Sequence, residues 1–346
     1  MSSYSILRPA LFALPPEKAH HLAIRALQCG LAPKSHYSHP ALATTLAGLA
    51  LPSPVGMAAG FDKNAEAVEG LQRAGFGFVE IGTVTPRAQP GNPQPRMFRL
   101  VKQQAVINRL GFNNEGMDAA AARLAVNRHG GVVGGNVGKN KESADALADY
   151  RMAMHALYGY VDYITANISS PNTPGLRNLQ AKAELQALVR GLHEERATLM
   201  QEHGFVQKPI FVKIAPDNDD AALIAIAQVA LEEKLDGLIV SNTTIQHNGE
   251  QGGLSGKPLF GPSTEVLRKM YAMTKGQVPL IGVGGIASAE DAYAKIRAGA
   301  SAVQLYTALI YQGMGLVERI NKGLVQLLER DGFTSVAQAV GADTKA

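Results

Sequence analysis

The sequence has very little cysteine. Cys29 is the only one among 346 residues, so no disulfide can form within the chain. A protein without disulfides is typical of a reducing compartment. Cys29 is also the only candidate for a thiolate nucleophile, and its place in an apolar stretch of helical periodicity argues against that role.

Sequence patterns for metal binding are absent as well. There is no His-Glu-x-x-His motif and no paired spacing of histidine and cysteine, the patterns that usually mark zinc sites. Four of the nine histidines lie before residue 40, and none stands at the end of a predicted strand. We therefore predict that the protein binds no metal, and that lysines, hydroxyls and amides around an organic cofactor carry its chemistry.

Long hydrophobic runs and basic stripes are missing too. No run of 18 apolar residues occurs, so no transmembrane helix is predicted. Pro9, Pro15 and Pro16 interrupt the apolar stretch near the start, and we expect no signal peptide. The net charge of +4 is modest, and no basic cluster with interleaved aromatics appears, so nucleic acid is not an expected partner.

The first 40 residues differ in charge from the rest of the chain. They hold +3 of the total, from Arg8, Lys18, Arg25 and Lys34 against Glu17. Two short helices are predicted here, one in the apolar piece at residues 6–14 and one that begins at Pro15-Pro16. From the residues alone, a helical cap on the main domain and a pair of membrane-facing helices are both open.

From residue 41 onward, short apolar runs alternate with segments of helical periodicity. Eight such runs occur, at 55–59, 78–84, 131–137, 162–168, 209–215, 237–243, 279–285 and 302–307. Continuous apolar runs are typical of strands buried on both faces, and their alternation with helices predicts parallel pairing. We therefore predict an α/β domain over residues 41–346, a (β/α)₈ TIM barrel, with residues 1–40 as a small N-terminal helical extension. The alternative, a doubly wound open sheet, would normally stop at roughly five to seven strands.

One segment does not follow this alternation. Met97–Val101 and Ala105–Ile107 are separated by Lys102-Gln103-Gln104, a pattern that predicts a hairpin inserted after the second strand. It leads directly into Asn108–Asn114.

Polar residues gather where the predicted strands end, and in a barrel the active site lies at those ends. The richest cluster, Asn167–Arg177, follows the fourth strand, and two prolines within it fix the backbone. It offers more hydrogen-bonding side chains than a turn needs: Asn167, Ser169, Ser170, Asn172 and Thr173. Asparagines also end the third and sixth strands, at Asn136 and Asn242. Together they predict an amide-lined pocket.

Two further features point to a bound anionic group. Lys213 lies within the apolar fifth strand, where an unpaired ammonium is costly, so it predicts a partner or a nearby anion, unless it is an edge lysine that reaches water. Gly282–Ile286, followed by Ser288, predicts a glycine turn that feeds a helix N-terminus and can bind phosphate. In barrels the usual phosphate site follows the last two strands, which is where this motif falls.

Taken in order, these motifs resemble those of dihydroorotate dehydrogenase, specifically its class 2, quinone-dependent form. The resemblance covers essentially the whole chain. It rests on Ala59–Lys63, Glu80–Pro86, Asn108–Asn114, Asn136–Lys141, Asn167–Arg177, Val212–Asp217, Ser241–Thr244, Gly252–Gly256 and Gly282–Ile286. It implies an enzyme that binds FMN on a barrel and oxidises dihydroorotate to orotate in pyrimidine biosynthesis, with ubiquinone or menaquinone as the final acceptor.

The resemblance also implies roles for matching residues. Ser170, where class 1 relatives have cysteine, would be the base that takes the C5 proton of the substrate, and Thr173 and Phe112 would line its relay. Lys213 would stabilise the charge that builds up on the reduced flavin. At the substrate we expect Lys63, Asn108, Arg109, Leu110, Gly111, Phe112, Asn172, Asn242 and Thr243. At FMN we expect Ala59, Gly60, Lys63, Thr83, Asn136, Asn167, Lys213, Ser241, Gly256, Gly285, Tyr306 and Thr307. Ser169 receives no role.

The N-terminal extension acquires a role from the same resemblance. In class 2 relatives two helices form a membrane-docked tunnel for the quinone, and His20, Arg99 and Tyr306 match positions that line it. The implied location is peripheral, on the cytoplasmic face of the bacterial inner membrane.

Three other functions remain as rivals on the residues themselves. The first is another FMN barrel, such as a class 1 enzyme or a 2-hydroxy-acid oxidase, which would use a histidine base at a strand end. The second is a lyase or isomerase of a phosphorylated substrate, with a Schiff base at Lys213. The third is a barrel that binds a ligand without catalysis.

Overall fold

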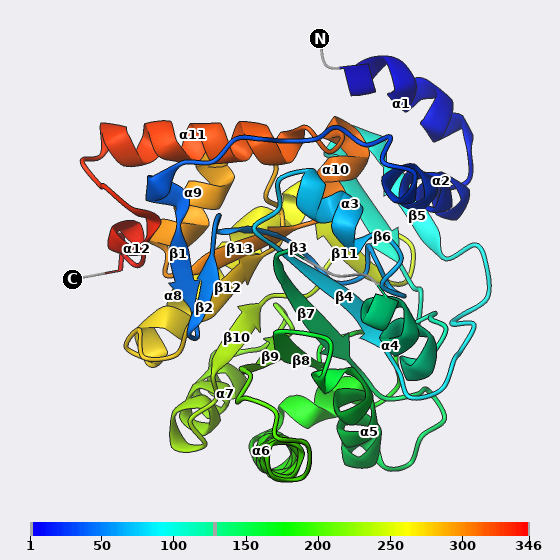
Figure 1. The fold of residues 1–346 in the computed structure, drawn as a ribbon, viewed down its shortest axis with the longest axis vertical. Helices are drawn as coiled ribbons and strands as arrows, with labels where there is room; N and C mark the ends of the chain where they lie inside the picture. The colour runs from blue at the N-terminus through cyan, green and yellow to red at the C-terminus, as the bar shows by residue number, and fades with distance from the viewer. Residues whose placement is uncertain (1–2, 127–129, 345–346) are drawn as a thin grey trace.

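Eight parallel strands close into a barrel at the centre of the protein, with helices around it (Figure 1). The computed structural model describes residues 3–126 and 130–344. In chain order the barrel strands are β3 (Val55–Met57), β4 (Phe78–Val84), β7 (Val132–Val137), β8 (Tyr163–Asn167), β9 (Ile210–Ile214), β10 (Gly237–Val240), β12 (Leu280–Val283) and β13 (Ala302–Leu305). Each coincides with one of the eight apolar runs. The predicted (β/α)₈ barrel is therefore confirmed, and the open sheet is wrong because β13 pairs with β3 and closes the ring.

The helices on the outside bury one face each against the barrel. They are α3 (Val68–Arg73), α4 (Met117–Val126), α5 (Ala146–Tyr158), α6 (Lys182–His203), α7 (Asp220–Glu232), α8 (Phe260–Met273), α9 (Ala289–Arg297), α10 (Thr307–Gln312), α11 (Leu316–Arg330) and α12 (Val336–Ala339). Short 3₁₀ turns lie at Pro40–Leu42, Val101–Gln103, Leu176–Gln180 and Lys257–Leu259. In α11 the buried Leu316, Ile320 and Leu324 recur every four residues, the spacing of a helix face that packs on a core.

Aromatic rings fill the lower part of the barrel interior. Phe78, Tyr163 and Phe211 lie over glycines of neighbouring strands, where a Cβ atom would come within 2.0–2.3 Å of the ring. Below them, β1 (Thr44–Leu46) and β2 (Leu49–Leu51) form an antiparallel hairpin just before β3. Its buried leucines join the same cluster as the rings. This apolar layer fills the amino end of the barrel, opposite the carboxyl ends of the strands.

A three-stranded sheet stands beside the open end. The predicted hairpin is present as β5 (Met97–Leu100) and β6 (Ala105–Asn108). A third strand, β11 (Gly253–Gly256), pairs antiparallel with β6 and comes from the loop after β10. The sheet thereby joins loops that follow the second and sixth barrel strands.

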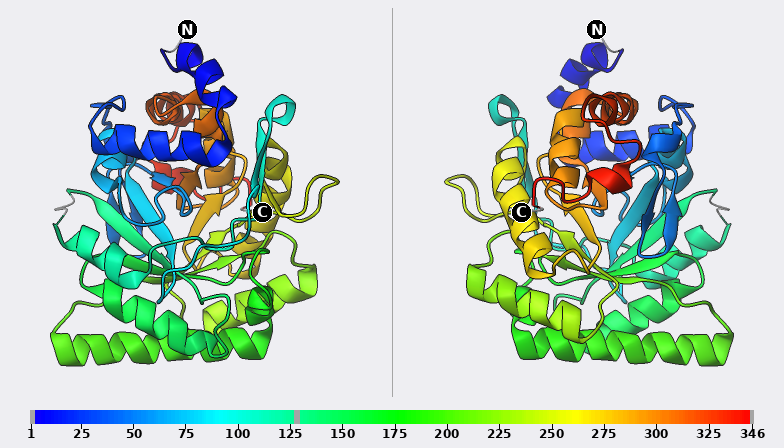
Figure 2. Two further views of the ribbon diagram at one scale, coloured as in Figure 1. Left: turned by 90° about the vertical axis from the view of Figure 1, so that its right-hand side faces the viewer. Right: turned by 90° about the vertical axis from the view of Figure 1, so that its left-hand side faces the viewer.

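The N-terminal residues form the two predicted helices, α1 (Ser3–Ala13) and α2 (Pro16–Gln28), with Pro16 in the first turn of α2. Figure 2 shows α1 standing out from the body of the barrel near α10. Its Ile6 and Leu7 are 77% and 59% exposed. Among the described residues, no helix has the length and apolar character needed to span a membrane. The domain boundary at residue 40 stays a prediction.

The packing of rings on glycines gives a stability prediction. A methyl group at Gly134 would stand 2.0 Å from Cζ of Tyr163, so Gly134→Ala should lower the free energy of unfolding by about 1–3 kcal/mol. At Gly261 nothing lies within 4 Å of an added Cβ, and Gly261→Ala serves as the control with no loss expected. Urea unfolding of both variants measures the difference; equal stability would contradict this packing.

Candidate active site

A large cavity lies at the carboxyl ends of the barrel strands. It holds about 1330 Å³ of space not filled by atoms, the solvent at its open mouth included. Most of the residues expected from sequence line it: Ala59, Gly60, Lys63, Thr83, Asn108, Leu110, Gly111, Phe112, Asn167, Ser170, Asn172, Lys213, Ser241, Asn242, Thr243, Gly256, Gly285, Tyr306 and Thr307.

The predicted amide layer forms the floor of this cavity. Thr83 Oγ1 donates to Asn136 Oδ1 at 2.6 Å and accepts from Asn167 Nδ2 at 2.9 Å. Asn136 itself is fully buried below the floor and does not belong to the lining. It acts on the cavity through Thr83, whose hydroxyl it orients.

Lys213 rises from β9 into the cavity and is 5% exposed. Burial lowers the pKa of its ammonium, and the negative charge of Glu80 opposes that shift. Glu80 is fully buried and accepts hydrogen bonds from Asn136 Nδ2 at 2.8 Å, from Tyr163 Oη at 3.0 Å and from Gln304 Nε2 at 2.9 Å. A buried lysine therefore stands at the cavity floor with a hydrogen-bonded carboxyl group behind it in the barrel, a placement that can stabilise negative charge on a bound ring.

Ser170 lines the cavity on the loop that follows β8, and it is 6% exposed. Its Oγ accepts a hydrogen bond from the backbone N–H of Asn172 at 3.3 Å. Asn172 Nδ2 in turn donates to the carbonyl of Asn108 at 3.2 Å, so the loop after β8 contacts the end of β6. Thr173 is buried in the same loop but is not among the lining residues. Its part in a proton relay stays a prediction.

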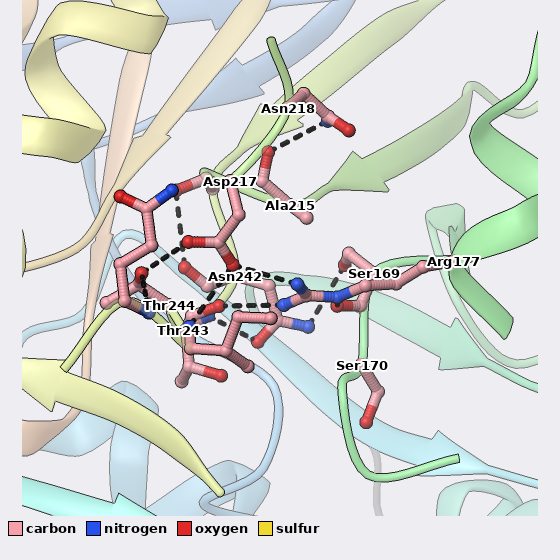
Figure 3. Close-up of polar contacts among 12 residues, drawn as sticks. Ser169, Ser170, Arg177, Ala215, Asp217, Asn218, Asn242, Thr243 and Thr244 are labelled. Carbon is pink, nitrogen blue, oxygen red and sulfur yellow. Dashed lines mark hydrogen bonds and ion pairs between the residues drawn. The ribbon is translucent and has the colours of Figure 1, made fainter. Parts of the chain in front are cut away.

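The guanidinium of Arg177 braces the serine loop (Figure 3). It donates to the carbonyl of Ser169 at 3.0 Å, to Asp217 Oδ2 at 2.8 Å and to the carbonyl of Thr243 at 3.2 Å. Asp217 also accepts from Thr244 Oγ1 and from the backbone N–H of Ile245. One side chain thus ties together the loops after β8, β9 and β10.

Ser169 belongs to the same brace, while the Ser170 side chain points away from it (Figure 3). The Ser169 hydroxyl donates to Asn167 Oδ1 and accepts from Asn242 Nδ2, both at 3.0 Å. It therefore couples a residue expected at the cofactor to one expected at the substrate. We assign Ser169 a structural part in the site, which sequence reasoning left without a role.

Arg109 does not reach the cavity. It lies over the ring of Phe98 at 4.8 Å, donates to the carbonyl of Pro95 at 3.0 Å and lines a separate outer cleft. The cavity wall is made by its neighbours Leu110 and Gly111 instead.

The residues expected at a quinone tunnel lie near α1 and α2. His20 contacts the rings of Phe61 and Tyr306 at centroid distances of 5.1 and 6.4 Å. Burial, with the positive charge of Lys63, lowers the pKa of His20 to about 3, so its ring is neutral. Arg99 Nη1 donates to the carbonyls of Phe12 and Leu14, at 3.2 and 3.0 Å, which end α1. Tyr306 alone of the three predicted residues also lines the main cavity.

Gln304 is a cavity residue that sequence reasoning missed. It lies within the apolar strand β13, which is the same signal that singled out Lys213. Its Nε2 donates to Glu80, whereas its buried Oε1 has no hydrogen-bond partner in the described chain. An acceptor without a partner suits a ligand that donates hydrogen bonds, as the pyrimidine part of a flavin does.

The glycine turn after β12 also fits a bound phosphate. Gly285 lines the cavity with φ +77°, and a Cβ there would stand 2.5 Å from Phe260. Only glycine allows this close backbone approach, and backbone N–H groups in such turns bind anions. The cavity thus combines a glycine turn, a buried lysine and, at Gln304, an acceptor without a partner among the described residues. This combination is that of a barrel protein whose cavity can hold a polar organic ligand.

Comparisons with known proteins identify the family. The family model described as dihydroorotate dehydrogenase matches residues 41–328. The dihydroorotate dehydrogenase (quinone) of Cereibacter sphaeroides is 54% identical over 96% of this chain and 95% of its own. That of Agrobacterium fabrum is 53% identical over 96% and 94%. The crystal structure of the Eimeria tenella enzyme in complex with ferulenol has a TM-score of 0.92 and 41% identity, over 98% of this chain and 99% of its own. The chain belongs to the dihydroorotate dehydrogenase family, whose members depend on a flavin.

The brace at Arg177 gives a testable prediction. Lysine cannot make the three hydrogen bonds that join the loops, so Arg177→Lys should slow flavin reduction by dihydroorotate by roughly 10–100-fold through misplacement of Ser170. Bound flavin should stay at the wild-type level, since Arg177 does not line the cavity. Rapid anaerobic mixing measures the rate. Arg190→Lys, at an exposed ion pair with Glu233, is the control; equal rates in both variants would refute the brace.

Proposed function

We propose that the protein oxidises (S)-dihydroorotate to orotate, with FMN as the hydride acceptor and a membrane quinone as the final electron acceptor, in de novo UMP biosynthesis. The observation that carries this proposal is the full-length similarity to quinone-dependent relatives, joined to a cavity that combines Ser170, Lys213 and the glycine turn. No histidine is among the described residues that line the cavity, which disfavours a 2-hydroxy-acid oxidase. Serine rather than cysteine at position 170 favours class 2 over class 1.

Each cavity residue then has a defined task. When bound, FMN supplies the hydride acceptor for C6 of the substrate. Ser170 takes the proton from C5, and Thr173 and Phe112 border its path out. A serine hydroxyl is a weak base, so its position must be held by the loop that Arg177 braces. Lys213 holds positive charge beside the ring that gains electrons.

The substrate carboxylate calls for a cation and several amides. Lys63 lines the cavity and its pKa is lowered to about 8 by burial, while the charge of Glu17 opposes that shift. It therefore remains largely protonated at neutral pH. Asn108, Asn172 and Asn242 place amide groups on the same wall, where they can pair with the ring amides of dihydroorotate.

The N-terminal helices are the proposed quinone entrance. The exposed apolar residues of α1, together with the basic charge of residues 1–40, suit the surface of an anionic membrane. A cleft between α2 and the main cavity is lined by His20, Phe61 and Lys63, and its wall also includes Glu17, Glu66 and Glu115. The neutral imidazole of His20 and the ring of Phe61 form an apolar part of this wall that suits a quinone ring. A peripheral site on the cytoplasmic face of a bacterial inner membrane fits these features.

Ser170→Ala tests the proton transfer. The variant should retain bound FMN, yet its reduction by dihydroorotate should be slower by roughly 10²–10⁴-fold, the usual contribution of a positioned base. Ser170→Cys, which keeps a group able to take a proton, should restore part of the rate. Anaerobic stopped-flow absorbance of the flavin measures both. Wild-type rates in the alanine variant would remove Ser170 from the reaction.

Replacing Ile6 and Leu7 with Asp tests the membrane surface. Both side chains are exposed on α1, so the fold and flavin reduction should be unchanged, while binding to anionic vesicles and turnover with a long-chain quinone should fall several-fold. A short, water-soluble quinone should react as before. Unchanged vesicle binding and unchanged turnover would refute membrane docking through α1. Val206 and Ile224, which are also exposed and are remote from the N-terminus in the chain, provide the control positions for the same substitutions.

A further inference from the structure

Lys295 is a buried lysine that the proposed reaction does not use. It lies on α9 with no exposed surface. Its Nζ donates to Ser263 Oγ at 2.8 Å and to Thr264 Oγ1 at 3.0 Å, both in the first turns of α8. The ring of Phe260 is 5.2 Å away. Within the described chain the ammonium has hydroxyl partners but no carboxylate at ion-pair distance.

This position is electrostatically unfavourable for a cation. Burial lowers the pKa of Lys295 to about 7, and Asp291, on the same helix, opposes that shift only from a distance. The first turn of α8 also presents the positive end of the helix dipole to the ammonium. The Lys295 ammonium and the N-terminus of α8 therefore both contribute positive potential here, and no carboxylate of the described residues pairs with the ammonium. A buried cation is normally kept only with a counter-charge.

Lys295 and the first turn of α8 lie directly behind the glycine turn of the cavity. The Ser263 hydroxyl, which holds Lys295, also lies 3.1 Å from the carbonyl of Gly284 and can donate to it. A Cβ at Gly285 would stand 2.5 Å from Phe260, the first residue of α8. The side chain of Lys295 packs against the same strand end, with its Cδ 3.2 Å from a Cβ built at Gly282. Gly284 and Gly285 both line the cavity at its proposed phosphate end.

We propose that Lys295 is the buried counter-charge of the cofactor phosphate. It does not touch the ligand; it acts as a positioning residue, through Ser263 and the glycine turn, and through its charge in the low-dielectric interior. Its effect is to favour a phosphorylated flavin over one that ends in a neutral hydroxyl. The inference rests on the proposed function in that it takes FMN to be the cofactor.

The competing explanation is a purely structural lysine that ties α8 to α9. The two explanations differ in what they predict for flavins with and without a phosphate. A structural tie acts through the shape of the turn, so Thr264→Val, which removes one hydroxyl tie and keeps the charge, would then weaken FMN binding as Lys295→Met does. A counter-charge affects FMN alone, because riboflavin lacks the anion.

The test compares full-length Lys295→Met with the wild-type protein. Bound flavin is first removed from both proteins. Each is then titrated with FMN or with riboflavin, and binding is followed by flavin fluorescence. Methionine keeps the length and apolar packing of the side chain but removes the charge. The Kd for FMN should rise by roughly tenfold or more, while the Kd for riboflavin changes by less than about twofold. Thr264→Val removes one hydroxyl tie and keeps the charge, so its preference for FMN should stay at the wild-type value.

The outcomes are distinct. An equal loss for both flavins, or no loss for either, would overturn the counter-charge. If Lys295→Met does not fold, Lys295→Gln gives the same comparison with a side chain that can still bond the two hydroxyls. Wild-type protein that binds neither flavin would instead refute the proposed cofactor and, with it, this inference.

Discussion

The buried carboxylate of Glu80 is the interaction on which the upper barrel depends. It lies in the interior between the aromatic layer and the cavity, and it accepts hydrogen bonds from side chains of β7, β8 and β13. A carboxyl group at this depth needs such donors, because a buried polar group without partners is costly. One of these donors, Asn136, also accepts from Thr83, so the same side chain holds the barrel interior together and orients the amide floor. The charge of Glu80 opposes the lowering of the Lys213 pKa by burial.

Three lysines, two of them buried and one half-buried, stand at places where the proposed ligands carry negative charge. Lys213 lies under the ring that gains electrons, Lys63 faces the expected substrate carboxylate, and Lys295 stands behind the glycine turn. Burial lowers the pKa of each ammonium. A bound anion raises the pKa of a nearby ammonium again, because it favours the charged form. Binding of cofactor and substrate would therefore stabilise the protonated lysines. The three lysines therefore favour ligands that carry negative charge near them.

The sequence was sufficient for the barrel because each strand is buried on both faces and is therefore a continuous apolar run. Polar residues at the strand ends located the cavity for the same reason. Strand β11 escaped prediction because two of its four residues are glycine, which is depleted in strands. The contacts of Arg177 and the position of Arg109 outside the cavity could not be predicted, because they depend on loops that are far apart in the sequence and meet only in the folded protein. Gln304 carried a readable signal, a polar residue inside an apolar strand, that sequence reasoning did not use.

The most direct test of the whole account is anaerobic titration of the purified protein with dihydroorotate, followed by addition of a quinone. The account predicts a yellow protein whose flavin absorbance bleaches when dihydroorotate is added and returns when the quinone is added. A colourless protein that takes up no FMN, or a flavin that dihydroorotate leaves oxidised, would contradict it.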